Sequence, residues 1–347
     1  MQTLDDRKAA ILRAIVQDYV RDGEPVGSKR LTDAWELGVS PATVRGEMAA
    51  LEQDGYIVQP HTSAGRVPTD KGYRFFVDTL TAQTSELLPE QAAAVEGLLL
   101  GASDLEDLLR RTSTVLSRLT RLTALVAVPA LDRSRIRHIE LVPLGGSTVM
   151  AVLIADTGRV EKRVFDLEQP VPEHEIARVR HAVNEAASGL RASQAPDVIL
   201  GVAAGAPAEV RGLLEALANA VRSGLAGELT GEHVFLGGTA NIAGGGYFEK
   251  LEQVKQVVEA LEEQVVVLRM LRETLSSGDP GVRIGTELPL VELAACSIVA
   301  ARYEAGGEAA GSLGVLGPTR MDYPRTLAAV QAVASSLEKA LAELTGG

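Results

Sequence analysis

Apolar residues recur every three or four positions through most of residues 4–54, which is the spacing of amphipathic helices. Glycines at 23, 38 and 55 interrupt this spacing, as is typical at helix ends. The pattern therefore predicts three helices, over residues 4–22, 28–37 and 41–54. Ser28 and Ser40 are suited to cap the second and the third helix.

The third predicted helix has two contrasting faces. One is an apolar stripe of Val44, Met48 and Leu51. The opposite face carries small or uncharged residues where a solvent-exposed helix usually carries Lys and Glu, namely Ala42, Gly46, Ala49 and Gln53. It is too smooth for an ordinary solvent face and not apolar enough for a core. We interpret it as a surface shaped to lie close against another molecule.

A two-stranded hairpin is predicted after the third helix. A short strand near 56–59 leads into a turn at 60–66, the chain returns through 67–69, and a fourth helix follows over 70–80. Three helices and a hairpin are the order of a winged helix-turn-helix, whose third helix enters the DNA major groove. The alternative is a small helical domain that packs against a partner protein. The hairpin and the Ser-Pro start of the third helix favour DNA binding.

The candidate DNA contacts follow from this placement. Ser40 and Thr43 offer hydroxyls at a helix N-terminus, where backbone N–H groups favour a phosphate, and Arg45 can reach a phosphate or a guanine. The hairpin turn has a flexible glycine and a cationic tip, suited to the DNA backbone or minor groove. The candidate residues are Ser28, Lys29, Arg30, Ser40, Ala42, Thr43, Arg45, His61, Thr62, Ser63 and Arg66.

The remaining chain predicts a sheet that is interrupted once. Two helices, over 88–100 and from 104 with Ser103 as its cap, precede four apolar runs at 122–129, 135–144, 147–156 and 159–167, which predict an antiparallel meander. After a helix near 172–189, strands recur only at about 295–303 and 312–317, before a helix over 322–344. The sheet is therefore predicted to be interrupted by a mostly helical insert over 191–281. A long helix over 247–275 in this insert has near-heptad apolar spacing, which fits burial in its own domain and a dimer contact equally well.

Composition narrows the class of protein. At 347 residues, two or three domains are expected, and 46% apolar content excludes wholesale disorder. The longest apolar stretch is too short to span a bilayer, and no secretory signal is recognisable, so we expect a cytoplasmic protein without a membrane partner. The net charge is −12, but residues 1–80 carry 10 Lys and Arg against 12 Asp and Glu, so a local basic patch there is compatible with the composition.

No enzymatic site is predicted. The stretch from His174 lacks the second histidine of a zinc-protease helix, and the glycine-rich residues 237–250 lack the ending of a P-loop. Cys296 is the only cysteine and lies among apolar residues, which is typical of an inert core thiol. His138, in a strand, is better explained as structural. We therefore predict no catalytic residue, no cofactor and no metal ion.

Three long stretches resemble the heat-inducible transcription repressor family (HrcA) of bacteria. They are residues 25–78 (PVGSKRL and VSPATVRGEMAALEQDGYIVQPHTSAGRVPTDKGYRFFVD), 234–242 (VFLGGTANI) and 311–325 (GSLGVLGPTRMDYPR). The resemblance implies an α+β protein with a winged-helix domain (1–80), a GAF-like α/β domain (81–190 and 282–347) and an inserted dimerisation domain (191–281). It further implies a homodimer that represses groE- and dnaK-type chaperone operons from an inverted-repeat operator, is released on heat stress, and is kept active by the GroEL chaperonin. The family often has Asn where this chain has Gly46, so Thr43 and Arg45 are expected to carry more of the base reading.

Two other functions remain open from the residues alone. The first is a winged-helix regulator controlled by a small effector bound in the GAF-like domain. The second is a protein-interaction scaffold without DNA binding.

Overall fold

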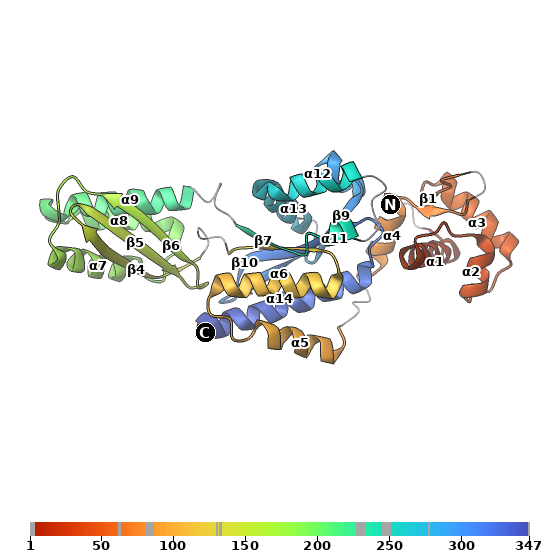
Figure 1. The fold of residues 1–347 in the computed structure, drawn as a ribbon, viewed down its shortest axis with the longest axis horizontal. Coiled ribbons are helices and arrows are strands. Elements are labelled where there is room, and N and C mark those ends of the chain that lie inside the picture. The colour runs from red at the N-terminus through yellow and green to blue at the C-terminus, as the bar shows by residue number, and fades with distance from the viewer. Residues whose placement is uncertain are drawn as a thin grey trace.

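Three units follow one another along the longest axis of the molecule (Figure 1). The computed structural model describes residues 4–61, 64–80, 87–129, 131, 134–226, 233–244, 251–276 and 278–345. A helical unit with a short hairpin lies at one end, a five-stranded sheet with its helices lies in the middle, and a three-stranded sheet with three helices lies at the other end. The chain is thus α+β, as predicted. Within the described ranges, every helix is too short or too polar to cross a membrane.

The N-terminal unit has the predicted order of elements. It consists of α1 (Asp6–Asp22), α2 (Ser28–Ala34), α3 (Pro41–Gln53), β1 (Ile57–Val58) and β2 (Val67–Pro68). The Asp5 side chain caps α1 and Gly23 ends it with a positive φ. The second helix is three residues shorter than predicted, because Trp35 adopts an extended backbone and packs its side chain against the core. Helix α4 (Asp70–Leu80) leads from this unit to the centre of the molecule.

The central unit is an antiparallel sheet covered by helices on both faces. Its strand order is β7 (Val234–Gly237), β3 (Thr123–Ala127), β10 (Glu308–Pro318), β9 (Cys296–Ala305) and β8 (Gly281–Ile284). One face packs on α6 (Leu105–Thr120) and α14 (Tyr323–Thr345), with α5 (Pro89–Leu99) outside them. The other packs on α12 (Leu251–Glu262) and α13 (Gln264–Leu275). Short helical turns are α11 (Asn241–Gly244), Gly285–Glu287 and Val291–Leu293.

The third unit is inserted between two neighbouring strands of the central sheet. The chain leaves after β3 and returns at β7, which pairs directly with β3. In between, β4 (Ile136–Gly145), β5 (Thr148–Ala155) and β6 (Val160–Asp166) form an antiparallel sheet. One face of that sheet shares a separate apolar core with α7 (Glu173–Ala187), α8 (Ala195–Ala204) and α9 (Ala208–Ala226). A turn at Ala192–Gln194 precedes α8.

The boundaries of the central sheet and of the inserted unit therefore differ from those predicted from the sequence. The meander predicted over 122–167 is wrong, since its first strand, β3, belongs to the five-stranded sheet and the other three form their own. The side chains of β3 are buried on both faces, whereas those of β5 alternate, as in a sheet with one covered face. The inserted unit accordingly lies between β3 and β7, not over 191–281.

The predicted long helix over 247–275 is also different. In its described part the helix is broken at Glu263, whose backbone is extended, into α12 and α13. Val257, Leu261, Val267 and Leu271 are buried against the central sheet. Burial within its own domain is therefore confirmed for part of this stretch, but Leu251 and Val265 of the heptad-like series are 83% and 62% exposed, so a dimer contact here stays a prediction. A smaller correction concerns α6, which is capped by the Asp104 carboxylate and not by Ser103.

We expect the inserted unit to be removable without loss of the central sheet. The N–H of Val128 donates to the carbonyl of His233 at 3.0 Å, so the two ends of the insert are adjacent. Replacing residues 130–232 by a two-residue Asn-Gly turn should leave a folded protein with one cooperative melting transition by circular dichroism. Deleting 191–281 instead removes β7, α12 and α13 and should abolish cooperative melting. Equal behaviour of the two deletion variants would contradict this division of the chain.

Candidate nucleic-acid interface

The outward face of α3 is exposed along its whole length. Val44, Met48 and Leu51 are buried, whereas Ala42, Arg45, Gly46 and Ala49 are exposed. The Ser40 hydroxyl accepts a hydrogen bond from the Thr43 N–H at 3.2 Å and lies 3.0 Å from the Thr43 hydroxyl. Ser40 therefore caps the helix as predicted, and both hydroxyls stay at the exposed N-terminal end, where an anion would meet free N–H groups.

Gly46 has no intramolecular reason to be glycine. Its φ lies outside the left-handed region, and a Cβ built on it would meet no atom within 4 Å. Glycine inside a helix costs about 1 kcal/mol relative to alanine. Neither packing nor backbone conformation within the described residues requires glycine at this position, which leaves the α3 backbone open to close approach by another molecule.

The candidate residues on α2 fall into two groups. Lys29 is exposed and, like Arg45, makes no ion pair with any residue that the structure describes. Ser28 is buried, with 9% of its surface accessible. Arg30 contacts the carboxylates of Asp18, which is fully buried, and of Asp22. The charge of Arg30 is thus balanced inside the N-terminal unit, which the spacing of cations along the sequence did not indicate.

The hairpin is tied to the end of α3 by a carboxylate. The Arg66 guanidinium donates from Nε to Glu52 at 2.9 Å, and only 21% of the Arg66 side chain is exposed. Glu52 also accepts from the N–H of Gln59 at 3.1 Å, and the Gln59 amide donates to the carbonyl of Ala64 at 2.9 Å. Glu52 and Gln59, which the sequence reasoning missed, therefore hold both strands of the hairpin. The available signal was Glu52 itself, an acidic residue at the end of α3 on the same side as Arg45.

The expected freely exposed cation at the hairpin tip is corrected by this pairing. Arg66 exchanges two backbone hydrogen bonds with Val26, both at 2.9 Å. Gly65 is packed closely rather than free, because a Cβ there would lie 2.5 Å from the carbonyl carbon of Val26. His61 is exposed, while Thr62 and Ser63 lie outside the described residues. Contact of Arg66 with DNA stays a prediction.

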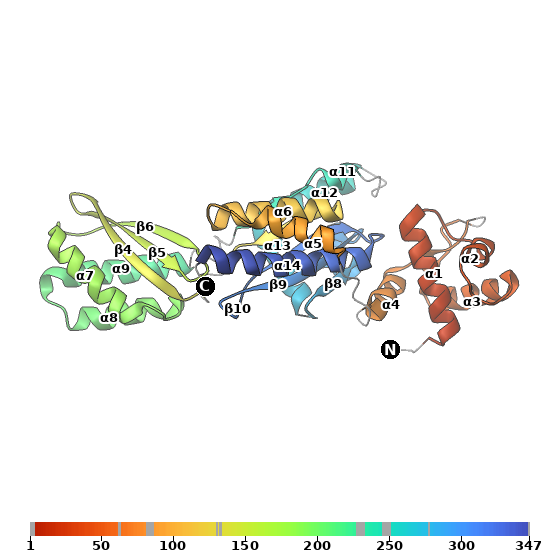
Figure 2. The ribbon, with the colours of Figure 1, turned by 90° about the horizontal axis from the view of Figure 1, so that it is seen from below.

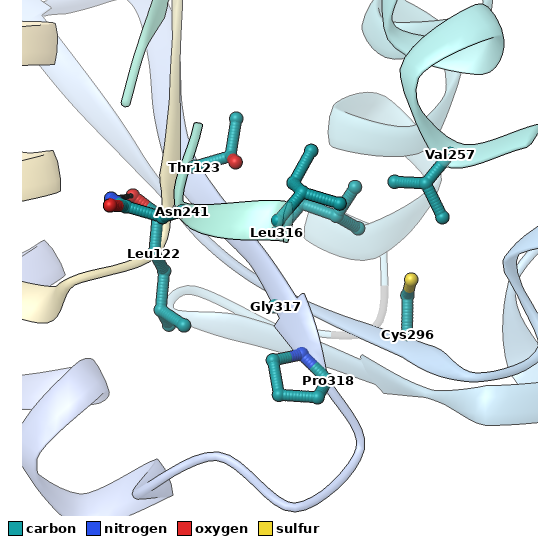
Figure 3. A pocket seen from close by; sticks show the side chains of 9 residues that line it. Leu122, Thr123, Asn241, Val257, Cys296, Leu316, Gly317 and Pro318 are labelled. Carbon is teal, nitrogen blue, oxygen red and sulfur yellow. Dashed lines mark hydrogen bonds between the residues drawn. The ribbon is translucent and has the colours of Figure 1, made fainter. Parts of the chain in front are cut away.

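One cavity inside the central unit has little room for a small effector. Figure 3 shows a cavity between the ends of β3 and β10, α11 and α12, lined in part by Asn241, Val257, Cys296 and Leu316. Its volume is about 10 Å³, which is the space of about one water molecule. Burial raises the pKa of the Cys296 thiol to about 12, so this thiol is not a reactive group at neutral pH.

Comparison with known proteins gives a consistent result along the chain. Residues 106–327 match the model of the HrcA protein C-terminal domain. The chain is 48% identical over 340 residues to the heat-inducible transcription repressor HrcA of Acidothermus cellulolyticus, covering 98% of this chain and 99% of that protein. It is also 48% identical over 339 residues to the protein of that name from Thermobifida fusca, covering 98% and 97%.

A solved structure shares the fold. It is the crystal structure of a hypothetical protein, with a TM-score of 0.65 and 24% sequence identity. The match covers 99% of this chain and 100% of that chain. At this identity the similarity concerns the fold alone.

We expect Thr43→Ala and Arg45→Ala to weaken specific DNA binding while leaving the fold intact. Both side chains flank the buried stripe of α3 without joining it. A lost base or phosphate contact should cost about 1–3 kcal/mol of binding free energy, measured by fluorescence anisotropy at one salt concentration. Arg110→Ala, which removes an exposed cation from α6, is the charge-matched control. Wild-type affinity in both α3 variants would show that this helix does not read DNA.

Gly46→Ala should separate stability from binding. Because space is open around Gly46, alanine should raise the free energy of unfolding by up to about 1 kcal/mol, measured by urea denaturation. The added methyl should at the same time weaken DNA binding, since it holds the α3 backbone away from the groove. Unchanged affinity in the stabilised variant would argue against close approach at this position.

Proposed function

Because this chain belongs to the HrcA family of heat-inducible transcription repressors, we propose a specific way in which it acts as a heat-shock transcriptional repressor. Two copies bind an inverted-repeat operator of a chaperone operon, with one N-terminal unit on each half-site. The observation that carries this proposal is the exposed, nearly uncharged face of α3, which begins at a capped N-terminus and bears Arg45.

The N-terminal unit acts in this proposal as a winged helix-turn-helix. Helix α3 lies in the major groove, and the hairpin, held by Glu52, lies against the neighbouring backbone. Helix α2 supplies Lys29 at the edge of the same surface. The acidic remainder of the chain is compatible with this arrangement, because Lys29 on α2 and Arg45 on α3 have no ion pair with a described carboxylate and stay available for a phosphate.

A homodimer is required by the same logic. One winged helix reads too few base pairs to select an operator in a genome, so two must act together. The uncovered face of the β4–β5–β6 sheet supports a two-fold contact in the inserted unit (Figure 2). Val142, Met150 and Val164 are neighbours in register across this face, and Val164 is 60% exposed. Two such faces would form a sheet-on-sheet core.

The GroEL chaperonin completes the proposal as a third partner. We propose that heat converts the repressor into an inactive form, as the family resemblance implies. GroEL then restores the active form in the cytoplasm. When little GroEL is free, the repressor stays inactive and the chaperone operon is transcribed. The alternative is a small effector bound in the GAF-like central unit, for which the cavity in Figure 3 is too small, because it holds about one water molecule.

A footprint on the upstream regions of the chain's own genome tests the proposal. The expected result is protection of an inverted repeat ahead of a chaperone operon, lost after heating and regained when GroEL and ATP are added. Absence of sequence-specific protection at any salt concentration would overturn DNA binding. Protection that GroEL does not restore would overturn the chaperonin step alone.

We expect Val152→Arg to break the dimer. Val152 lies in the middle of the uncovered face, on β5 between Glu140 and Lys162, and in a dimer the longer side chain of arginine would hold the two faces apart. Sedimentation equilibrium should show a monomer with a wild-type circular dichroism spectrum. Val291→Arg, at a valine of the central unit that is 88% exposed, is the matched control and should stay dimeric. A dimeric Val152→Arg protein would move the two-fold contact elsewhere.

A further inference from the structure

Helix α4 lies between the N-terminal unit and the central sheet and contacts both (Figures 1 and 2). On one side it holds the chain that directly follows α3. The Thr69 hydroxyl, just before α4, donates to the carbonyl of Gly55 at 2.7 Å, and the Lys71 ammonium donates to the carbonyl of Asp54 at 2.7 Å. Gly72 allows this approach, because a Cβ there would lie 2.2 Å from the carbonyl oxygen of Tyr56. The end of α3 is therefore fixed to the start of α4.

On its other side α4 is bound to the turn that follows β8. The Asp70 carboxylate accepts from the N–H and the hydroxyl of Thr286, both at 2.9 Å. Gly285 has a φ of +54° and leaves the space that Asp70 occupies, since a Cβ there would lie 2.2 Å from the carboxylate. Together, the two hydrogen bonds and the close fit fix the first turn of α4 on the sheet.

Arg74 adds a second attachment one turn later. Its guanidinium donates to Glu287 at 2.8 Å and to the carbonyl of Val282 at 2.8 Å. Burial opposes the charge of Arg74, but its hydrogen bond to Glu287 together with the negative charges of Glu287 and Asp78 outweighs burial and raises the pKa of Arg74. A planar guanidinium held by a carboxylate and a carbonyl fixes the orientation of α4 on the sheet as well as its distance from the sheet.

A third attachment reaches α1 from the loop between β10 and α14. A Cβ on Gly23, which ends α1 with a φ of +74°, would lie 2.4 Å from Nη1 of Arg320. The Arg320 guanidinium thus lies at the carbonyl end of α1, where the helix dipole favours a cation. Arg320 belongs to the 311–325 stretch. In the first turn of α14, just after this loop, Arg325 instead donates to the carbonyl of Leu119 at the end of α6, within the central unit.

We propose that Asp70, Arg74 and Arg320 are positioning residues that fix the angle of α3 relative to the central sheet, so that a dimer reads two half-sites at one spacing only. This inference rests on the proposed function. The three attachments lie on α1 and on two turns of α4, and three separated contacts define an orientation where one would leave a hinge. Binding of the second half-site is intramolecular, so its strength depends on whether this geometry is kept.

The test compares DNA with one half-site and DNA with two. Arg320→Met, Arg74→Met and Asp70→Asn are measured separately, with Arg325→Met, at the start of α14, as the matched control. Duplexes carry a single half-site, the natural inverted repeat, or repeats whose spacing is changed by one to three base pairs. Half-site binding is measured at low salt, where it is strong enough to detect.

The expected result is a change in the ratio of the two affinities. Each positioning variant should bind the half-site within about twofold of wild type, bind the natural repeat about tenfold or more weakly, and tolerate altered spacing better than wild type does. Arg325→Met should keep the wild-type ratio, and Arg320→Lys should restore part of it by keeping a cation at α1.

Other outcomes overturn the inference. If the natural repeat is bound as by wild type, or if both affinities fall equally together with the melting temperature, these residues have only a structural role. A wild-type protein that binds neither duplex would instead refute the proposed function, which keeps the two failures distinct.

Discussion

Strand β3 joins the inserted unit to the central sheet, because it pairs with β10 on one side and with β7 on the other. The first pairing brings the loop with Arg320 beside α1, since that loop follows β10 directly. The second closes the base of the inserted unit. With Val126 facing α6 and α14 and Leu125 facing α12 and α13, the strand also joins both helical layers into one body. The base of the inserted unit and the position of the Arg320 loop therefore depend on this five-residue strand, whereas α4 is held by β8 and the turn that follows it.

At the candidate interface, the pairing of cations with carboxylates matters more than the number of cations. Arg30 and Arg66 are engaged by Asp18 and Glu52, so they stabilise the N-terminal unit and position its hairpin. Arg45 and Lys29 are the cations left exposed on α3 and α2 without a described ion pair. A surface of this kind relies on fit, through Gly46 and its small neighbours, together with a few charges. It suits a protein whose net charge is −12 and which must reject most DNA.

The two ends of the molecule carry the two proposed recognition surfaces. Helix α3 lies at one end in Figure 1, and the uncovered sheet of the inserted unit lies at the other. Between them, a small rotation at α4 becomes a large displacement of α3 relative to a two-fold axis. The polar, directional contacts on both sides of α4 limit such a rotation. The polar contacts of Arg135 and Arg191 with Glu308 hold the insert against the β9–β10 hairpin in a similar way.

The sequence by itself determined those features that depend only on residues close together in the chain. The helices of the N-terminal unit, the Ser40 cap and the hairpin follow from periodicity and turn chemistry, and three long stretches indicated the family. Only the tertiary structure decided that β3 pairs with β10, that the insert begins after β3, and that Arg30 and Arg66 face carboxylates. A continuous apolar run predicts a buried strand but not its partner, because backbone N–H and C=O groups are the same in every strand. Likewise an arginine pairs with whichever carboxylate folding brings within reach, and for Arg66 that is Glu52, 14 residues earlier on another element.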